Sequence, residues 1–596
     1  MTSQHTFHIP VLGLAYSIDT PVKVARFGIS SVISVVQDEL VEQMRHFHAV
    51  KNNIAFHPVF KTTFDYRAKR ITEYLNLIKE LVHKQIDILK QESYTAGTEI
   101  TKYFTLLPDE SVVKKLYFRM LQASGAAQVN LQNQLREHIL PGSIDVNIMT
   151  KIDGHNYHSD MKNMDPELFS EALAALRGYA NSTLESSVIF SAGLNPRLYS
   201  YLETFPDFFP DDEQRIRKRV IIKVSDFRSA SIQGKFLAKK GVWVSEFRIE
   251  SGLNCGGHAF ATDGYLMGPV LEEFKEKQNE LTRELRVLVN VALIGKKQPI
   301  LAENENIRFT VQGGIGTASE DHFLRTHYCM DATGWGSPFL LVPEATNVDE
   351  ETLKDLACAT PDDYYLSGAS PLGVPFNNFR KSSAEKQRMK RIESGKPGSP
   401  CMRKHLSFNT EFTPKTLCTA SRKYQHLKIR ELNTLALTPP VYKQKLADIT
   451  EKDCLCEGLS AVGYQLNDPT QKLNMNAVTI CPGPNLVYFS GIFKLNQMVD
   501  HIYGRASLLN SIERPHMFVN ELKMYIDYLK KDLLKLTAPL TSKQVKYYTS
   551  FRQNLLSGIQ YYKKLDPLKP WLSLLEHYEL KLNKISLENP VLAYEN

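Results

Sequence analysis

Eight short apolar runs separated by helical patterns occupy the first 345 residues, and this alternation most strongly limits how the chain can fold. The runs that we expect to be strands are residues 8–15, 29–36, 144–152, 187–192, 219–224, 242–249, 307–312 and 328–333. Helices are expected between most of them, for example at 230–240 and 271–285. Strands that alternate with helices pair in parallel, and eight such units match a closed β/α barrel. We therefore predict an α/β fold, a (β/α)8 TIM barrel, with a doubly wound open sheet as the alternative.

A long helical region interrupts this alternation after the second run, at about residues 37–138. Within it, one face of an amphipathic helix is marked by apolar residues three or four positions apart: Ile71, Leu75, Ile78, Val82, Ile86 and Leu89. We interpret the region as a helical insertion in a barrel that spans residues 1–350. Just before it, Thr20 and Pro21 predict the start of a short helix, with Thr20 as the N-cap.

The character of the chain changes after residue 350. Residues 351–490 form a basic, cysteine-containing region, and residues 491–596 are expected to be mainly helical, with Phe518, Leu522 and Ile526 on one face. The segment 377–398 has seven Lys or Arg against two Glu, so we predict a solvated linker or loop. The basic and aromatic stretch 376–430 is compatible with an anionic substrate, an acidic carrier protein or RNA, but interspersed acidic residues favour a solvated surface.

The overall charge and hydropathy exclude several classes of protein. A net charge of +7 over 596 residues is too small a bias to imply a nucleic-acid partner. No apolar run reaches the roughly 18 residues that a membrane helix needs. The first residues lack a basic and then apolar signal pattern, so the eight cysteines are expected to be reduced thiols or ligands and the location cytoplasmic. The sequence predicts no particular oligomeric state.

Glycine-rich segments follow the last three apolar runs. Gly256 and Gly257 precede His258, whose imidazole titrates near neutrality, so His258 is a candidate general base. The segment that contains Gly313 and Gly314 leads into a helix, and its backbone N–H groups would offer an anion site. Residues 336–337, Gly and Ser, add N–H groups and a hydroxyl. Taken alone, each segment is equally compatible with a tight structural turn.

The ordered set of motifs resembles the flavin-dependent nitronate monooxygenases (2-nitropropane dioxygenase-like proteins) and related FMN enoyl reductases. The resemblance covers roughly residues 1–36 and 140–346, and it rests on residues 13–17, 146–148, 252–258, 313–315 and 336–344. It implies that FMN binds on a TIM barrel, with its phosphate at Gly313, Gly314, Gly336 and Ser337 and further contacts at Gly13, Asn147, Ser251, Gly256 and Gly257. It also implies that His258 faces the reactive edge of the flavin, either as the base for a substrate proton or as a hydrogen-bond donor.

Some positions depart from the pattern of that family. Asn254 and Cys255 stand where the family has an acidic residue and alanine, Ser251 replaces a glutamine, and Pro338 replaces the arginine of the phosphate loop. We therefore expect an FMN-dependent oxidoreductase, with NAD(P)H as a candidate reductant, but not specifically a nitronate substrate. One alternative is an enoyl-thioester reductase for lipid or polyketide assembly, docked to an acidic carrier protein. Another is a non-catalytic flavin- or phosphate-binding scaffold associated with RNA or a protein partner.

Five cysteines fall within about eighty residues of the C-terminal half, namely Cys401, Cys418, Cys454, Cys456 and Cys481. Thiolates bind zinc or iron–sulfur clusters, so these residues are candidate ligands of such a site. No pair has the C-x-x-C spacing, however, and buried reduced cysteines are the favoured interpretation.

Overall fold

The computed structural model describes residues 4–154, 166–191, 193–253, 263–467, 477–534, 536 and 540–585. Its central feature is a closed barrel of parallel strands, in which each strand pairs with the next and β8 pairs with β1. The strands are β1 (Phe7–Ile9), β2 (Ser30–Ser34), β3 (Ile144–Met149), β4 (Ser187–Ser191), β5 (Arg219–Val224), β6 (Val244–Glu250), β7 (Arg308–Gln312) and β8 (Ala332–Gly334). Because the sheet closes on itself, the predicted TIM barrel is confirmed and the open sheet is wrong.

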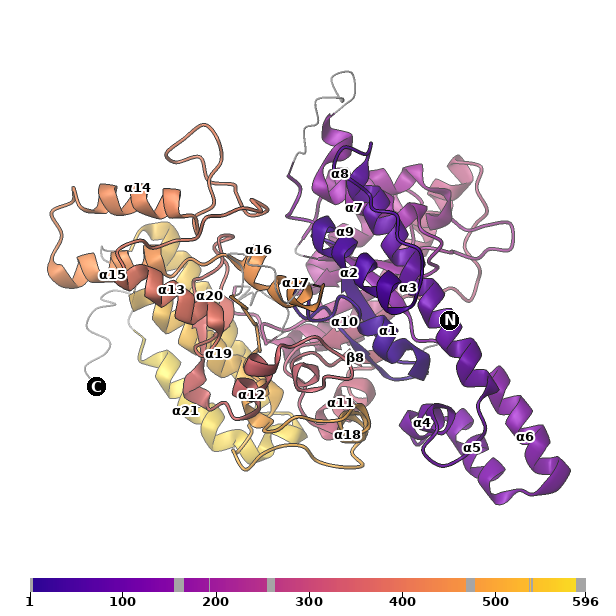
Figure 1. The fold of residues 1–596 in the computed structure, drawn as a ribbon. Coiled ribbons are helices and arrows are strands. Elements are labelled where there is room, and N and C mark those ends of the chain that lie inside the picture. The colour runs from indigo at the N-terminus through magenta and orange to yellow at the C-terminus, as the bar shows by residue number, and fades with distance from the viewer. Residues whose placement is uncertain are drawn as a thin grey trace.

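Helices alternate with these strands and surround the barrel (Figure 1). They are α1 (Thr20–Val24), α7 (Glu171–Asn181), α8 (Pro196–Tyr201), α9 (Phe227–Ala238), α10 (Met267–Gly295) and α11 (Ala318–Thr326). The start of α1 lies one residue earlier than predicted, because Asp19 is the N-cap and Thr20 is already helical. The Thr20 hydroxyl instead donates to the carbonyl oxygen of Ala345, at 2.7 Å.

The helical insertion lies between β2 and β3, as predicted. It consists of α2 (Asp38–Lys51), α3 (Tyr66–Gln91), α4 (Glu99–Leu106), α5 (Val112–Gln122) and α6 (Gly125–Glu137). The periodic apolar residues at 71–89 form the buried face of α3, which packs on α2 and α7. Helices α4, α5 and α6 extend away from the rest of the insertion (Figure 1).

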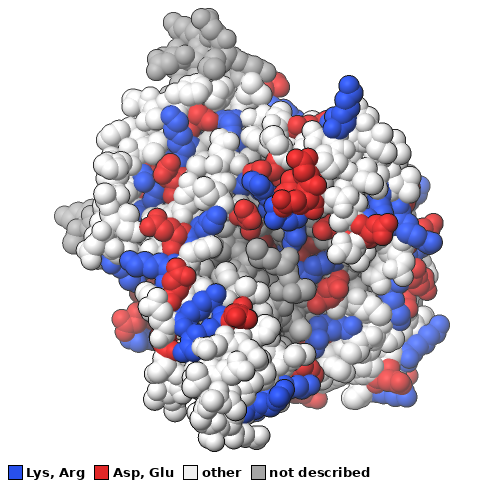
Figure 2. All heavy atoms as spheres, turned by 90° about the vertical axis from the view of Figure 1, so that its right-hand side faces the viewer, with Lys and Arg blue, Asp and Glu red and all other residues white. Residues whose placement is uncertain are grey.

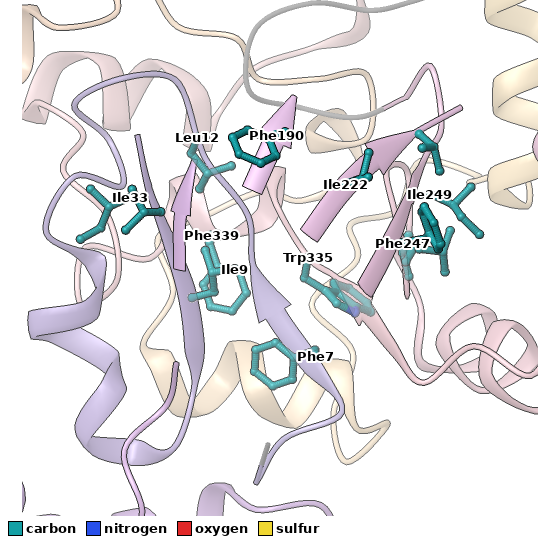
Figure 3. Close-up of a cluster of buried hydrophobic side chains, with 14 of the residues drawn as sticks. Phe7, Ile9, Leu12, Ile33, Phe190, Ile222, Phe247, Ile249, Trp335 and Phe339 are labelled. Carbon is teal, nitrogen blue, oxygen red and sulfur yellow. The ribbon is translucent and has the colours of Figure 1, made fainter. Parts of the chain in front are cut away.

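The apolar side chains on the two faces of the barrel strands belong to two separate clusters. Apolar side chains such as Ile33, Phe190 and Ile222 point outward and pack under the surrounding helices (Figure 3). The residues between them in sequence point inward, because side chains alternate along a strand. A small separate cluster of Val32, Ile189 and Ile221 therefore lies inside the barrel.

The C-terminal half packs against the barrel and shares its core. It comprises α12 (Glu350–Ala357), β9 (Tyr364–Ser367), β10 (Phe376–Phe379), α13 (Ser383–Glu393), α14 (Arg422–Leu432), α15 (Pro439–Thr450), α16 (Leu455–Gly458), α17 (Ala461–Asn467), α18 (Leu495–Ile502), α19 (Met517–Leu534), α20 (Ser542–Tyr562) and α21 (Leu572–Asn583). Helices α19–α21 lie on one side of the barrel and α3 and α7 on the other (Figure 1). One hydrophobic cluster runs from Phe7 of β1 through Leu285 of α10 to Leu522 of α19 and Leu582 of α21.

The prediction of a solvated loop at residues 377–398 is wrong. Strand β10 pairs with β9 as an antiparallel hairpin, and α13 follows it. Phe376 and Phe379 are fully buried, and the Ser382 side chain caps α13 by accepting from the N–H of Glu385. The cations are compatible with this structure because some pair locally, as Arg388 does with Glu385. In the sequence, the many charges of this segment therefore outweighed the signal of its few buried apolar residues.

None of the helices in the described ranges combines the length and hydropathy required to cross a bilayer.

Candidate functional site

The structure brings most of the predicted site residues to one end of the barrel. Gly13 follows β1, Ser251 follows β6, and the pairs at 313–314 and 336–337 follow β7 and β8. Asn147 lies within β3 and is buried. Because all eight strands are parallel, their carboxyl ends meet at the same rim, where β/α barrels carry their active sites. His258, Gly256 and Gly257 lie outside the described residues.

The loops after β7 and β8 leave the barrel side by side, since Gln312 pairs with Gly334. Gly313 and Gly314 have φ values of 111° and 80°, which favour glycine, and a Cβ on Gly314 would come within 2.5 Å of Leu253. Across the described residues, the N–H groups of Gly314, Gly336 and Ser337 donate to no protein acceptor. Three uncommitted donors on two adjacent loops, with the nearby Ser337 hydroxyl, are a donor set that fits a phosphate group.

The amide of Gly316, two residues after Gly314 in the β7 loop, is already occupied. The N–H of Gly316 donates to the Glu320 carboxylate at 2.8 Å, as does the N–H of Met517 at 2.7 Å. Burial opposes ionisation of Glu320, but the nearby guanidinium of Arg514 outweighs this effect and lowers the pKa of the carboxyl. An anion bound at this rim could therefore accept a hydrogen bond from the N–H of Gly314, but not from that of Gly316.

Arg514 joins the C-terminal half to this loop. Its guanidinium donates to Glu320 at 2.7 Å, to the carbonyl oxygen of Gly314 at 2.8 Å and to Asn485 Oδ1 at 3.0 Å. The side chains of Arg514 and Glu320 are only 4% and 3% exposed. The ion pair thus fixes the β7 loop from a residue about 200 positions later in the chain.

A row of polar side chains crosses the interior near the same end of the barrel. Lys223 Nζ of β5 lies 2.7 Å from Glu250 Oε1 of β6, and Gln312 Nε2 of β7 donates to that oxygen at 2.7 Å. The His8 ring of β1 lies 3.2 Å from Gln312 Oε1. Burial, together with the charge of Arg248, lowers the pKa of His8 to about 3, so its imidazole is neutral at physiological pH. These four residues form a fixed set of donors and acceptors at the barrel mouth.

A second charged layer lies deeper in the barrel and supports that row. Glu246 accepts from Thr310 Oγ1 at 2.6 Å and lies 2.7 Å from an Arg248 nitrogen. Burial opposes its ionisation, but Arg248 and Arg308 outweigh this effect and lower the pKa of Glu246 to about 2. Neither layer was predicted from the sequence, although polar residues recur at alternate positions of otherwise apolar strands.

The segment between β6 and α10 is held at both stems by a buried carboxylate. Ser251 Oγ donates to Glu521 Oε1 at 3.0 Å, and the N–H of Met267 donates to Glu521 Oε2 at 2.8 Å. Burial raises the pKa of Glu521 to about 7. The Ser251 hydroxyl is thus committed to a helix of the C-terminal half, and that helix anchors the segment to which the sequence assigns His258.

A cavity of about 440 Å³ opens beside the β7 loop. Its walls come from the β9–β10 hairpin, from α19, from the segment before α18 and from the segments after β6 and β7. They include Leu253, Gly314, Tyr364, Asn377, Tyr488 and Tyr528. We refer to it as the hairpin cavity. Its size is that of a small-molecule pocket.

The five cysteines do not assemble into one site. Cys401, Cys418 and Cys456 pack in one small cluster with Leu406, whereas Cys481 belongs to the main core. A hydrogen bond between the thiols of Cys401 and Cys418 lowers the pKa of Cys401 and raises that of Cys418. Within the described ranges, no three His, Cys, Asp or Glu side chains are grouped to hold a metal ion. The five candidate ligands therefore do not form one group, although Cys401, Cys418 and Cys456 are neighbours.

The cations of the 376–430 stretch are partly neutralised. Lys428 lies 2.7 Å from both Glu411 and Glu431, and Arg403 pairs with Glu39 of α2. These pairings favour the solvated surface that the sequence predicts for this stretch. Figure 2 shows a different face of the molecule, on which basic and acidic side chains are also intermixed.

Comparison with known proteins gives structural neighbours only. No family model and no curated protein matches the chain. An enoyl reductase domain of MlnA, from the macrolactin biosynthesis cluster of Bacillus amyloliquefaciens, is 14% identical, covers 69% of this chain and 87% of its own, and has a TM-score of 0.30. A nitroalkane oxidase from Streptomyces ansochromogenes is 9% identical, covers 84% and 95%, and has a TM-score of 0.33. Both are enzymes of the kinds to which the sequence resemblance points, but at these scores neither likeness bears on the activity of this chain.

Proposed function

We propose that the protein is a flavin-dependent oxidoreductase that binds FMN at the carboxyl end of its barrel. The observation that carries this proposal is the pair of adjacent loops after β7 and β8, with uncommitted N–H groups at Gly314, Gly336 and Ser337. These groups suit a phosphate that must be held without an arginine, since Pro338 occupies the position of the family's arginine.

Three groups of residues would have distinct roles in this function. Gly313, Gly314, Gly336 and Ser337 would hold the phosphate of FMN, which when bound supplies hydride or single-electron transfer. The row from Lys223 to His8 would present fixed donors and acceptors toward the barrel mouth. Glu521 would keep the β6–α10 segment anchored while His258 holds or transfers a proton at its imidazole.

Two substrate classes are candidates for this enzyme. Oxidation of a nitronate-like compound is the first candidate, because the ordered glycine motifs resemble those of nitronate monooxygenases. Reduction of an enoyl thioester is the second candidate, and anaerobic absorbance separates the two. A nitronate would donate electrons to the oxidised flavin and bleach it, whereas an enoyl thioester would accept electrons from flavin bleached by NADPH and restore its colour. A flavin that binds but cannot be reduced, together with co-purifying RNA, would instead favour the scaffold alternative.

Replacing His258 with asparagine tests the proton-handling role. We expect His258→Asn to retain the flavin colour and to lose roughly 10²–10⁴-fold in turnover, which is the usual contribution of a positioned acid or base. His322→Asn is the matched control, because His322 is exposed on α11. Turnover of His258→Asn equal to that of the control would remove His258 from the mechanism while leaving flavin binding untouched.

A further inference from the structure

Cys401 and Cys418 lie together in the small cluster that also contains Cys456 and Leu406, and both are free thiols. The Cys418 thiol donates a hydrogen bond to the Cys401 sulfur. This bond, together with the N–H of Lys404, lowers the pKa of Cys401 although burial opposes the effect. The same hydrogen bond and burial raise the pKa of Cys418. One sulfur of the pair is thus favoured as a thiolate nucleophile, and the other is a thiol in contact with it.

Backbone hydrogen bonds join the two ends of the segment between these cysteines. The N–H of Ser399 donates to the carbonyl oxygen of Ala420 at 2.9 Å, and the N–H of Arg422 donates to that of Ser399 at 2.8 Å. Within the segment, Asn409 and Leu417 exchange backbone hydrogen bonds of 3.0 and 2.7 Å. The backbone therefore brings the two thiols together from both sides, and a covalent bond between them requires only local movement.

The segment between the two thiols, residues 402–417, contacts the barrel. His405 Nδ1 lies 2.8 Å from Glu171 Oε1 of α7. Leu406 belongs to the same apolar cluster as Ile152, which follows β3 at the carboxyl end of the barrel. A covalent bond at the base of this segment would therefore restrain a contact between the C-terminal half and the barrel mouth.

We propose that Cys401 and Cys418 are a peroxide-sensitive thiol pair, which hydrogen peroxide converts into a disulfide. The Cys401 thiolate attacks one oxygen of the peroxide, the O–O bond breaks, and Cys401 becomes a sulfenic acid while the hydroxide released takes up a proton to give water. The Cys418 sulfur then attacks the Cys401 sulfur, the S–O bond breaks, and the hydroxyl group leaves as a second water with the proton of Cys418. The two sulfurs lose two electrons and the peroxide gains them. A dithiol reductant reverses the reaction, and none of these steps depends on flavin binding.

Treatment of the reduced full-length protein with one equivalent of hydrogen peroxide tests the proposal. Non-reducing tryptic digestion and mass spectrometry detect the disulfide, because trypsin cleaves after Arg403 and Lys415 and so separates the two cysteines. We expect one linked pair of peptides, about 2 Da lighter than the sum of the two reduced peptides, since two hydrogens are lost. The exposed Cys358, whose thiol donates to the carbonyl oxygen of Lys354, should react at least about tenfold more slowly.

Three variants separate the roles of the neighbouring sulfurs. Cys401→Ser provides the blank, in which no linked peptide is expected. Cys418→Ser should stop at the sulfenic acid of Cys401, which the trapping reagent dimedone labels. Cys456→Ser is the matched control, because Cys456 lies in the same cluster, and it should still form the disulfide between Cys401 and Cys418.

Hydrogen exchange measures the effect of the disulfide on the segment it closes. Backbone amides within residues 402–417 should exchange at least about threefold more slowly in oxidised than in reduced wild type, because the bond opposes local opening. Cys401→Ser treated in the same way should show no change. Unchanged exchange in a fully oxidised sample would contradict the restraint on this segment.

Three other results would overturn the thiol pair itself. The first is the absence of a linked peptide in the wild type, or a disulfide of Cys401 with Cys456 in its place. The second is oxidation of Cys358 before that of Cys401. The third is one zinc ion per chain that co-purifies with the wild type and is lost in Cys401→Ser, because the thiols would then be metal ligands.

Discussion

Replacing Arg514 with methionine should lower the free energy of unfolding by about 3–5 kcal/mol, the usual cost of removing one partner from a buried ion pair. The change leaves the Glu320 carboxylate buried, and its remaining hydrogen bonds among the described residues come from the N–H groups of Gly316 and Met517. It also removes the donors to the carbonyl oxygen of Gly314 and to Asn485. Urea unfolding followed by circular dichroism measures the effect.

Two further variants give the Arg514 prediction its controls. Arg215→Met removes an exposed arginine that pairs with Asp211 and Glu213, and it should leave the unfolding free energy nearly unchanged. Arg514→Met combined with Glu320→Gln should recover part of the loss, because the uncompensated charge is gone. A single variant as stable as Arg215→Met, or a double variant less stable than Arg514→Met, would contradict the buried ion pair.

Glu521→Gln should make the protein more stable at pH 8 than the wild type, but not at pH 4.5. Burial raises the pKa of Glu521 to about 7 from an ordinary value of 4.5, so the folded state holds a proton that the unfolded state releases. Folding is therefore favoured most below pH 4.5, and this contribution is lost as the pH rises to 7. The full shift corresponds to about 3 kcal/mol.

Melting temperatures of wild type and Glu521→Gln at pH 4.5 and pH 8 measure this effect. Glutamine stays neutral and can still accept from Met267 while donating to the Ser251 hydroxyl, so the anchor of the β6–α10 segment is kept. Glu350→Gln, at an exposed position of α12, is the control. A difference between wild type and Glu521→Gln that is the same at both pH values would contradict a raised pKa of Glu521 in the folded state.

The barrel could be predicted from the sequence because its signals are local. Each strand is a short run such as residues 219–224, bounded by helical patterns, and the predicted and observed ranges of β5 coincide. The glycine positions of the site were also visible as motifs. The hairpin at β9–β10 was not, because the apolar signal of Phe376 and Phe379 is brief and is followed by a dense run of charge.

The remaining features of the site depend on contacts between distant parts of the chain. Glu521 meets Ser251 across 270 residues, and Arg514 meets Gly314 across 200. No local pattern in the sequence predicts contacts between residues so far apart in the chain. The sequence could therefore nominate the glycines of the β7 loop, but it could not indicate that the Gly316 amide is occupied by Glu320 while that of Gly314 is uncommitted.

The most direct test of the account is a comparison of FMN and riboflavin binding by the purified protein, followed by flavin fluorescence and absorbance. With FMN bound, we expect absorption bands near ~375 and ~450 nm. We also expect FMN to bind at least about tenfold more tightly than riboflavin, since of the two only FMN offers a phosphate to the loops after β7 and β8. A colourless protein that fails to take up added FMN would contradict flavin binding at this site. Equal affinities for the two flavins would contradict the phosphate site at Gly314, Gly336 and Ser337.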